Sequence, residues 1–430
     1  MPAAVSASSS AKDESLQEPL RRQCALVLRL LIVAEFALIG CTWNLWWGTN
    51  TFPIVSMSPV PGSAMANIWC SRITLLVFAA AMTGALVRLH TSGGHRMFGG
   101  ALATAVLLTV LNQQRLQPWH WLFILMILQA ILLDGRLLRT SLRLTIVSLY
   151  VFSALSRITT EPAGSMSGPI VQTLLNLILP QAQRIDQQTI DWLAFLLTCG
   201  EFAAGLLLLI PWTRRGGIVA AILMHTLLLV AFSPVGLDHH PGVLVWNGFL
   251  AVCVPLLFME QRAIPESSHR DELRAPRFLV VATTLILFPL SGLFGLADNW
   301  LSWQVYSPRP ETIYLLVTTE SARLLPPGAQ QHVGRPFVLS EWRPVQLDRW
   351  SLAAVGVPLY PEDRFLISVI ESLTRRIPDG DFRIEMNRPQ FPDWWNRSTA
   401  AIENRTALIS RQQKFIIPSY CLPIDPNPDR

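Results

Sequence analysis

Nine segments of this 430-residue chain are apolar over nearly the length that a helix needs to cross a lipid bilayer. A helix spans the hydrocarbon core with about 20 apolar residues. Hydrocarbon offers no water to the backbone, so such segments fold as helices that pack side by side. We therefore predict an all-α polytopic membrane bundle of about nine transmembrane helices. The predicted spans are 24–46, 69–88, 97–113, 119–134, 143–160, 190–211, 216–234, 242–259 and 278–297.

The third and fourth spans are short, and a re-entrant hairpin is the alternative for them.

The composition agrees with a membrane protein, since 51% of the residues are hydrophobic and 15% are charged, against roughly 25% charged in a soluble domain. No charge run indicates a nucleic-acid partner. The six cysteines form no Cys-x-x-Cys pair, which disfavours a thiol redox centre. The chain also lacks a Gly-x-Ser-x-Gly elbow, a P-loop, a His-Glu-x-x-His motif and a dinucleotide fingerprint.

Arginine and lysine gather in alternate loops, and this asymmetry predicts sidedness, because cytoplasmic loops carry the excess of positive charge. The opposite loops hold only Arg115, Arg157 and Arg184. We predict a cytoplasmic N-terminus and an extracytoplasmic region after about residue 298. The arginine bias, the short loops and the lack of a signal peptide favour a bacterial inner membrane over an endoplasmic reticulum.

The last 130 or so residues differ from the rest, with fewer apolar runs and many Pro and Arg residues. Segments 311–318 and 381–386 have the pattern of strands, and 361–373 has the pattern of a helix with one apolar face. We predict a small external α+β C-terminal domain. The predicted organisation is a disordered cytoplasmic N-terminus at 1–22, a transmembrane domain at 23–298 and an extracytoplasmic domain at 299–430. A short apolar segment at 170–179 is predicted to be an interfacial or re-entrant helix that covers the outer mouth. It could act as a gate, and an ordinary packed loop helix is the alternative.

Two ionisable residues near the middle of predicted spans are the centre of the candidate site. Glu201 lies in the sixth span and His225 in the seventh, at similar depth if the two helices are antiparallel neighbours. An ionisable side chain at that depth costs about 2.5 to 3.5 kcal/mol or more, so such residues usually face a bundle interior or a cavity. The pair could relay a proton or hold the polar headgroup of a ligand. The alternative is a hydrogen-bonded pair that locks two helices together.

Five further residues are candidates for ligand binding, and no metal site is predicted. Asp238, His239 and His240 are ligand types without the spacing of a closed zinc site. Arg157 could bind an anionic headgroup or a carboxylate, or it could be an ordinary interfacial arginine. Glu35 is a second intramembrane carboxylate, whose predicted partner is a buried arginine such as Arg72 or another polar residue of the bundle. The five candidates are Tyr150, Arg157, Trp246, Asn247 and Glu35.

The stretch Tyr150-Val-Phe-Ser-Ala-Leu-Ser-Arg157 resembles a Tyr-Phe-x-Ala-Gly-x-x-Lys segment, and Glu201-Phe-Ala-Ala-Gly205 and His225 follow it in matching order. These features are similar to the family of membrane proteins related to vitamin K-dependent gamma-carboxylase, also called the horizontally transferred transmembrane domain (HTTM) family, and more distantly to DoxX-like membrane proteins. The resemblance covers roughly residues 20–300. It implies a cavity for a quinone or other isoprenoid lipid.

The chain departs from that family at the residue that matters for carboxylation. The family's lysine acts as a base toward the hydroquinone, and the matching positions here are Ser156 and Arg157. Arginine is too basic to serve as a proton acceptor under ordinary conditions. Glutamate carboxylation is therefore disfavoured, while the lipid or quinone cavity is still expected.

Two functions from different classes follow. The first is a carboxylase-like or redox-associated membrane enzyme, or a cofactor-binding protein, which holds a quinone or isoprenoid lipid near Glu201 and His225. The second is a non-catalytic DoxX-like accessory or scaffold protein, whose external domain engages a periplasmic protein partner. A transporter is the third choice, since the sequence contains no visible inverted repeat.

Overall fold

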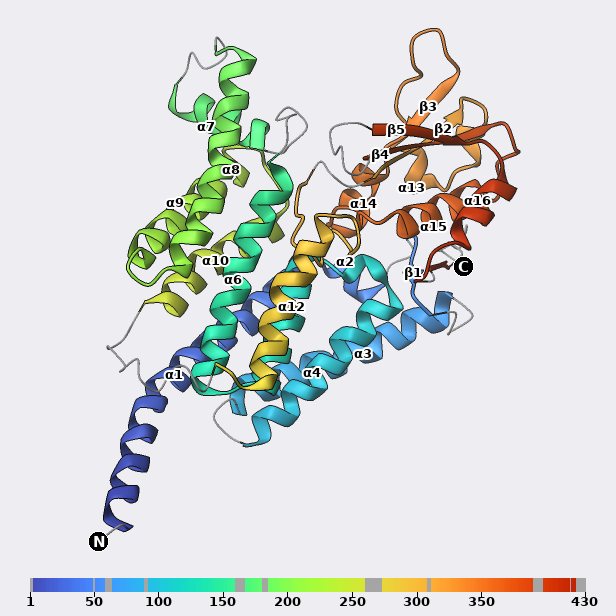
Figure 1. Ribbon diagram of the computed structural model, residues 1–430. Helices are drawn as coiled ribbons and strands as arrows, with labels where there is room; N and C mark the ends of the chain where they lie inside the picture. Colours follow the sequence, from blue (N-terminus) through green and yellow to red (C-terminus); the bar gives the residue numbers. More distant parts are fainter. Residues whose placement is uncertain are drawn as a thin grey trace. The chain divides into compact units, whose positions relative to one another are not determined.

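The computed structural model describes residues 3–48, 51–58, 64–88, 92–158, 167–179, 185–259, 273–307, 311–389, 397–417 and 419–422. Within these residues the chain is mostly helical, with a small sheet region in its C-terminal part (Figure 1). The residues group into two compact units. The first unit comprises Met1–Leu38, Ala81–Leu102 and Trp121–Pro308, and the second comprises Ile39–Ala80, Ala103–His120 and Arg309–Arg430.

A helix lies at each of the nine predicted spans. Six of these helices, α1, α3, α6, α8, α9 and α10, contain a stretch of at least 18 residues that is apolar enough to cross a membrane. The other three contribute shorter apolar stretches of 10–17 residues, so the count of nine spans is not confirmed. The six long helices identify an integral membrane protein. The nine helices are α1 (Ala3–Cys41), α3 (Ala64–Arg88), α4 (Ser92–Leu111), α5 (Pro118–Leu132), α6 (Gly135–Arg157), α8 (Gln187–Leu209), α9 (Arg214–Phe232), α10 (Pro241–Phe258) and α12 (Pro276–Gly292).

The structure also describes the N-terminal residues and the short helix that precedes α8. Helix α1 begins at Ala3, although the sequence predicts disorder up to residue 22. Residues 3–22 include four alanines and two glutamates, which are good helix formers, and they continue directly into the apolar part of the helix. The short helix predicted at 170–179 is α7 (Ser167–Ile178), which packs Ile170 against α9 and Val171 against α8.

Helix α6 is central to the first unit, where it packs against α8, α10 and α12, while α9 packs between α8 and α10 (Figure 1). Glycines allow two of these close approaches. A Cβ at Gly217 would lie 2.7 Å from the backbone nitrogen of Leu208, so only glycine permits the tight turn from α8 into α9. A Cβ at Gly205 would lie 3.0 Å from Val151 and 3.2 Å from Tyr150, which brings α8 directly onto α6.

The second unit contains a four-stranded antiparallel sheet in the order β3-β2-β4-β5. The register pairs Leu315 with Ile384 and Val317 with Phe382, so the alternating apolar residues line one buried face. The two predicted strands and the predicted helix therefore correspond to β2, β4 and α15. The elements of this part are β2 (Thr312–Thr318), η5 (Ser321–Leu324), α13 (Pro327–Gln330), β3 (Trp342–Val345), α14 (Leu347–Val355), α15 (Asp363–Thr374), β4 (Phe382–Pro389), β5 (Arg397–Ile402) and α16 (Arg405–Gln412).

Segments from distant parts of the sequence complete the second unit. Strand β1 (Val55–Ser56) pairs with β6 (Tyr420–Cys421) near the end of the chain. Helix α2 (Trp43–Trp47) and the single turn η1 (Gln113–Arg115) lie in the same unit. The side chain of Gln114 donates to Ser351 and to the carbonyl of Pro358, and it accepts from the backbone nitrogen of Tyr360. This unit thus joins the ends of membrane-length helices to the sheet region.

Candidate intramembrane binding site

Three side chains in the first unit form a continuous series of hydrogen bonds. The hydroxyl of Tyr150 on α6 lies 2.7 Å from Nε2 of His225 on α9. Nδ1 of His225 lies 2.9 Å from Oδ1 of Asn247 on α10. All three residues are buried, and their exposed fractions are 0%, 3% and 4%. The series connects three helices at the centre of the bundle.

The backbone determines the direction of these bonds. Nδ2 of Asn247 donates to the carbonyl of Val243, which turns the amide oxygen of Asn247 toward His225. His225 must then carry its proton on Nδ1 to donate to that oxygen, and its Nε2 is left with a lone pair. The Tyr150 hydroxyl therefore donates to Nε2. The oxygen of Tyr150 retains its capacity to accept a hydrogen bond from another group.

An ion pair lies beside this series. Arg157 at the end of α6 binds the Glu201 carboxylate on α8, and each side chain is 12% exposed. The guanidinium of Arg157 also donates to the carbonyl and the hydroxyl of Ser153, one helical turn earlier. These bonds fix the direction of the guanidinium. Glu201 is close enough to interact electrostatically with both Tyr150 and His225.

Helix periodicity explains how α6 contributes to both parts of the site. Tyr150 and Arg157 are seven residues apart, which is two helical turns, so they lie on one face of α6. Gly205 is one turn from Glu201 on α8 and packs against Tyr150. The close approach of these two helices therefore places the carboxylate of Glu201 within reach of Arg157. The result is a polar site that contains a proton acceptor on His225, the Glu201–Arg157 ion pair and the hydroxyl of Tyr150.

The structure joins five of the predicted residues in ways that the sequence does not show. Glu201 and His225 each bind a residue of α6, whereas a hydrogen bond between the two is one of the two alternatives that the sequence offers. The proton relay and the binding of a headgroup stay predictions. Arg157 is the partner of Glu201, so it binds a carboxylate of the protein itself, a partner that the sequence does not identify. Ser153 was not predicted, although its spacing of four residues from Arg157 on one helix could have indicated the contact.

Two predicted residues lie apart from these contacts. Trp246 precedes Asn247 on α10 and stacks on Phe249, with ring centroids 6.3 Å apart. Glu35 is buried in α1 with an exposed fraction of 1%, and its pairing with Arg72 stays a prediction. Arg72 donates to the carbonyl of Trp47 and lies over that residue's ring.

The histidine pair before α10 has a local structural role. Nδ1 of His240 accepts from the backbone nitrogen of Gly242 and so caps the start of the helix, while Nδ1 of His239 accepts from the nitrogen of His240. Burial lowers the pKa of both rings, which keeps them neutral near neutral pH. No group of three His, Cys, Asp or Glu residues in the described part of the chain could hold a metal ion.

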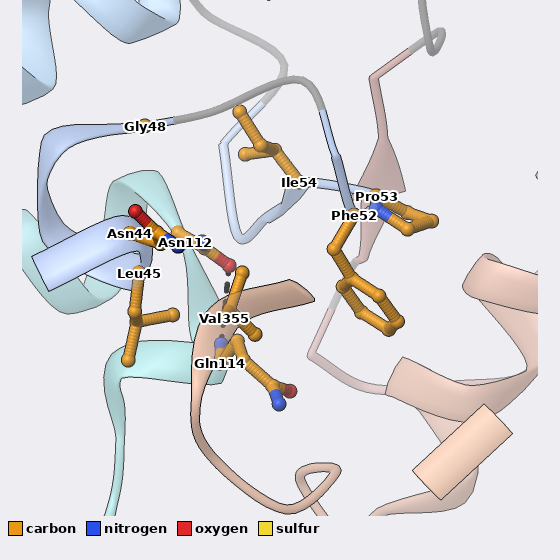
Figure 2. A pocket seen from close by; sticks show the side chains of 9 residues that line it. All are labelled: Asn44, Leu45, Gly48, Phe52, Pro53, Ile54, Asn112, Gln114 and Val355. Atoms are coloured by element: carbon orange, nitrogen blue, oxygen red, sulfur yellow. Dashed lines mark hydrogen bonds between the residues drawn. The ribbon is translucent and has the colours of Figure 1, made fainter. Parts of the chain in front are cut away.

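A cavity of about 10 Å³ lies in the second unit, where there is room for about one water molecule. Figure 2 shows that Asn112 and Gln114 are hydrogen-bonded to each other at its wall. Such a volume excludes a lipid or quinone headgroup. The cavity is lined by Asn44, Leu45, Gly48, Phe52, Pro53, Ile54, Asn112, Gln114 and Val355.

Arg115, which follows the cavity-lining residue Gln114 in the chain, is a buried cation with a structural role. It is 1% exposed and donates to the carbonyls of Leu45, Trp46 and Leu108 and to the hydroxyl of Ser71. Those carbonyls belong to the ends of α2 and α4, where a positive charge is favourable. Burial lowers the pKa of Arg115 to about 9, so the residue remains charged near neutral pH.

Comparison with known proteins gives no match to the chain. No family model, no curated relative and no solved structure is significantly similar to it. The resemblance to the gamma-carboxylase-like family therefore stays a prediction from the sequence motifs. The class of protein that the helices define is an integral membrane protein with a buried polar site.

Proposed function

We propose that this protein binds a quinone or another isoprenoid lipid with a polar headgroup at the site formed by Tyr150, His225, Asn247, Arg157 and Glu201. The observation that supports the proposal most directly is the hydrogen-bond series from Tyr150 to Asn247 beside the Glu201–Arg157 ion pair. Burying five polar side chains within apolar helices costs free energy. Apolar side chains could hold the same helices together without this cost. A ligand that needs these groups provides the reason to retain them.

The direction of the hydrogen bonds decides what such a headgroup must offer. Tyr150 and Glu201 present oxygen atoms that accept, so a ligand hydroxyl would fit better than a carbonyl. If that hydroxyl gave its proton to Tyr150, Tyr150 could pass its own proton to Nε2 of His225. The Asn247 oxygen and the Glu201 charge would then stabilise the imidazolium. The site can thus hold a hydroxyl and accept a proton from it.

The same reasoning separates this proposal from glutamate carboxylation. The guanidinium of Arg157 is paired with Glu201 and donates to Ser153, so it is an orienting and counter-charge group. Ser156 is fully buried and donates to the carbonyl of Ser153. Neither residue supplies the base that the lysine provides in the carboxylase-like family.

We also propose that the protein lies in a bacterial inner membrane, with a cytoplasmic N-terminus and an extracytoplasmic C-terminal domain.

A binding titration tests the proposal. Full-length protein in lipid nanodiscs would be titrated with a short-chain quinone and with its quinol, and binding would be followed by quenching of tryptophan fluorescence. We expect saturable binding that prefers the quinol. Tyr150→Phe removes one hydroxyl from the site and should weaken quinol binding roughly tenfold, the effect of one hydrogen bond of about 1.4 kcal/mol.

The matched control is Tyr314→Phe, because Tyr314 lies on β2 with half of its side chain exposed. That variant should bind as the wild type does. Equal affinity of the wild type and Tyr150→Phe would remove Tyr150 from the site. The absence of saturable binding of either form to the wild type would exclude quinones as ligands.

A second candidate function is a non-catalytic accessory protein whose external domain engages a periplasmic protein. The loop that leads into β3 favours it. Phe337, Val338 and Leu339 are consecutive, and their exposed fractions are 52%, 91% and 104%. The backbone nitrogen of Phe337 donates to the carbonyl of Trp342, which gives the loop an ordered turn. Consecutive exposed apolar residues in an ordered loop are typical of a contact with another protein.

Cross-linking in native membranes tests this candidate. A photoreactive amino acid at Val338 should give one discrete cross-linked protein, and the same probe at Gln331, in the same domain, should not. A Val338 probe that captures only lipid, or nothing, would contradict the accessory role.

A further inference from the structure

The turn Trp303–Ser307 is bonded to the end of α6 that carries Arg157. The hydroxyl of Ser307 donates to the carbonyl of Ser156, 2.8 Å away. Arg157 is also close enough to interact electrostatically with Tyr306. The turn therefore covers the outer end of α6, next to the Glu201–Arg157 ion pair.

The backbone of this turn is strained at two aromatic residues. Trp303 has a φ of 63° and Tyr306 has a φ of 57°. Residues with a Cβ rarely adopt this left-handed conformation, and bulky residues do so least readily. Such strain persists only where the surroundings impose it, and it gathers at sites that bind or switch. Two strained aromatics within four residues indicate a conformation of high energy.

A buried polar atom and a tight contact add to this strain. Gln304 is 2% exposed, and its Nε2 has no hydrogen-bond partner among the described residues. Leaving such a donor without a partner costs free energy. The turn also packs against α12 at Gly292, where a Cβ would overlap the side chain of Ser302 and lie 3.0 Å from Nε2 of Gln304. The turn keeps its position only because residue 292 has no side chain.

We propose that the turn Trp303–Ser307 is the gate of the proposed site, and that it moves away from the end of α6 to admit a ligand to Glu201 and Arg157. The inference rests on the proposed function only for the identity of the ligand that enters the site. It accounts for a site that is closed in the structure, with Tyr150 fully buried and each side chain of the ion pair 12% exposed. The strain, the unpartnered amide and the tight contact all make the closed position easier to leave.

Two substitutions should move the gate in opposite directions. Gly292→Ala places a methyl group against Ser302 and should push the turn outward. Gln304→Met keeps the volume of the side chain, removes the unpartnered donor and should hold the turn closed. Gly216→Ala is the matched control, because a Cβ at Gly216 meets nothing within 4 Å.

Hydrogen exchange in full-length protein measures the movement. The amides of Trp303, Gln304 and Val305 bond within residues 299–305 and are protected when the turn is closed. We expect Gly292→Ala to accelerate their exchange by roughly tenfold or more, and Gln304→Met to slow it. Gly216→Ala should leave it unchanged. Equal exchange in all four proteins would overturn the proposal, and Gln304→Met keeps the test valid if Gly292→Ala does not fold.

Access to the site is measured with dicyclohexylcarbodiimide, a hydrophobic reagent for carboxyl groups. Mass spectrometry of peptides would locate the label, and Glu201→Gln would identify the signal from Glu201. We expect more label on Glu201 in Gly292→Ala and less in Gln304→Met. Faster exchange of the turn without more label on Glu201 would contradict the gate. Neither readout uses a quinone, so a gate that opens while no quinone binds would refute only the proposed ligand.

Discussion

A double-mutant cycle on Glu201 and Arg157 would test the ion pair quantitatively. Both side chains are 12% exposed, so each charge loses most of its contact with water. Removing one partner of a buried pair costs about 3–5 kcal/mol, because the remaining charge is left uncompensated. Replacing both partners costs far less. We therefore expect the free energy of unfolding to fall by about 3–5 kcal/mol in Glu201→Gln and by little in the double variant.

The two single variants should differ in their free energy of unfolding, because Arg157 also bonds to Ser153. Arg157→Met also removes the two hydrogen bonds to Ser153. At about 1 kcal/mol each, their loss makes Arg157→Met the more destabilising substitution by about 1–2 kcal/mol. The double variant Glu201→Gln, Arg157→Met should retain only that smaller loss.

Reversible unfolding in mixed micelles, followed by circular dichroism, would supply the four free energies. Glu320→Gln is the control, since Glu320 is an exposed residue of the second unit, and it should change the free energy of unfolding by less than about 0.5 kcal/mol. Losses that simply add in the double variant would show that the two charges do not interact, and the described site would then lack its ion pair.

Three further predictions concern other parts of the chain. Gly205→Ala should destabilise the first unit by about 1 kcal/mol through overpacking of α8 on α6, whereas Gly200→Ala, with nothing within 4 Å of its Cβ, should not lower the melting temperature. Arg115→Met should cost about 3 kcal/mol or more, measured by chemical unfolding, because three buried carbonyls lose their donor. The pKa of Glu311 is raised from its ordinary value of 4.5, because burial outweighs the ion pair with Arg388. The folded state then holds this proton more tightly than the unfolded state does, so the contribution of Glu311 to stability is fully present below 4.5 and is lost as pH rises through the window just above it. Glu311→Gln should flatten that part of the stability profile, and an unchanged profile would contradict the assignment.

The sequence predicts the helices of this fold well, because apolar length is a local signal. All nine predicted spans coincide with helices, and the alternation of Phe382, Ile384 and Met386 locates β4. The number of crossings is harder to predict, since the apolar stretches of α4, α5 and α12 are shorter than the bilayer needs. Length and hydropathy do not distinguish a short span from a helix that is buried without crossing.

The partners within the site could not be predicted from the sequence. The sequence identifies Glu201 and His225 by their cost in a membrane, but the packing order of the helices decides what each residue meets. Helix α6 lies against α8, so Glu201 meets Arg157, and the α8–α9 turn does not bring Glu201 and His225 into a hydrogen bond. The strain at Trp303 and Tyr306 leaves no sequence signal, because neither residue type favours a positive φ.

Mass spectrometry of small molecules that co-purify with the protein tests the central claim most directly. The detergent-solubilised wild type would be compared with the double variant Glu201→Gln, His225→Ala, and with Tyr314→Phe as a folded control. We expect a quinone or another isoprenoid lipid at about one molecule per chain in the wild type and in Tyr314→Phe, and its loss in the double variant. A wild-type protein without such a molecule, or a double variant that retains it, would contradict a ligand site at Glu201 and His225.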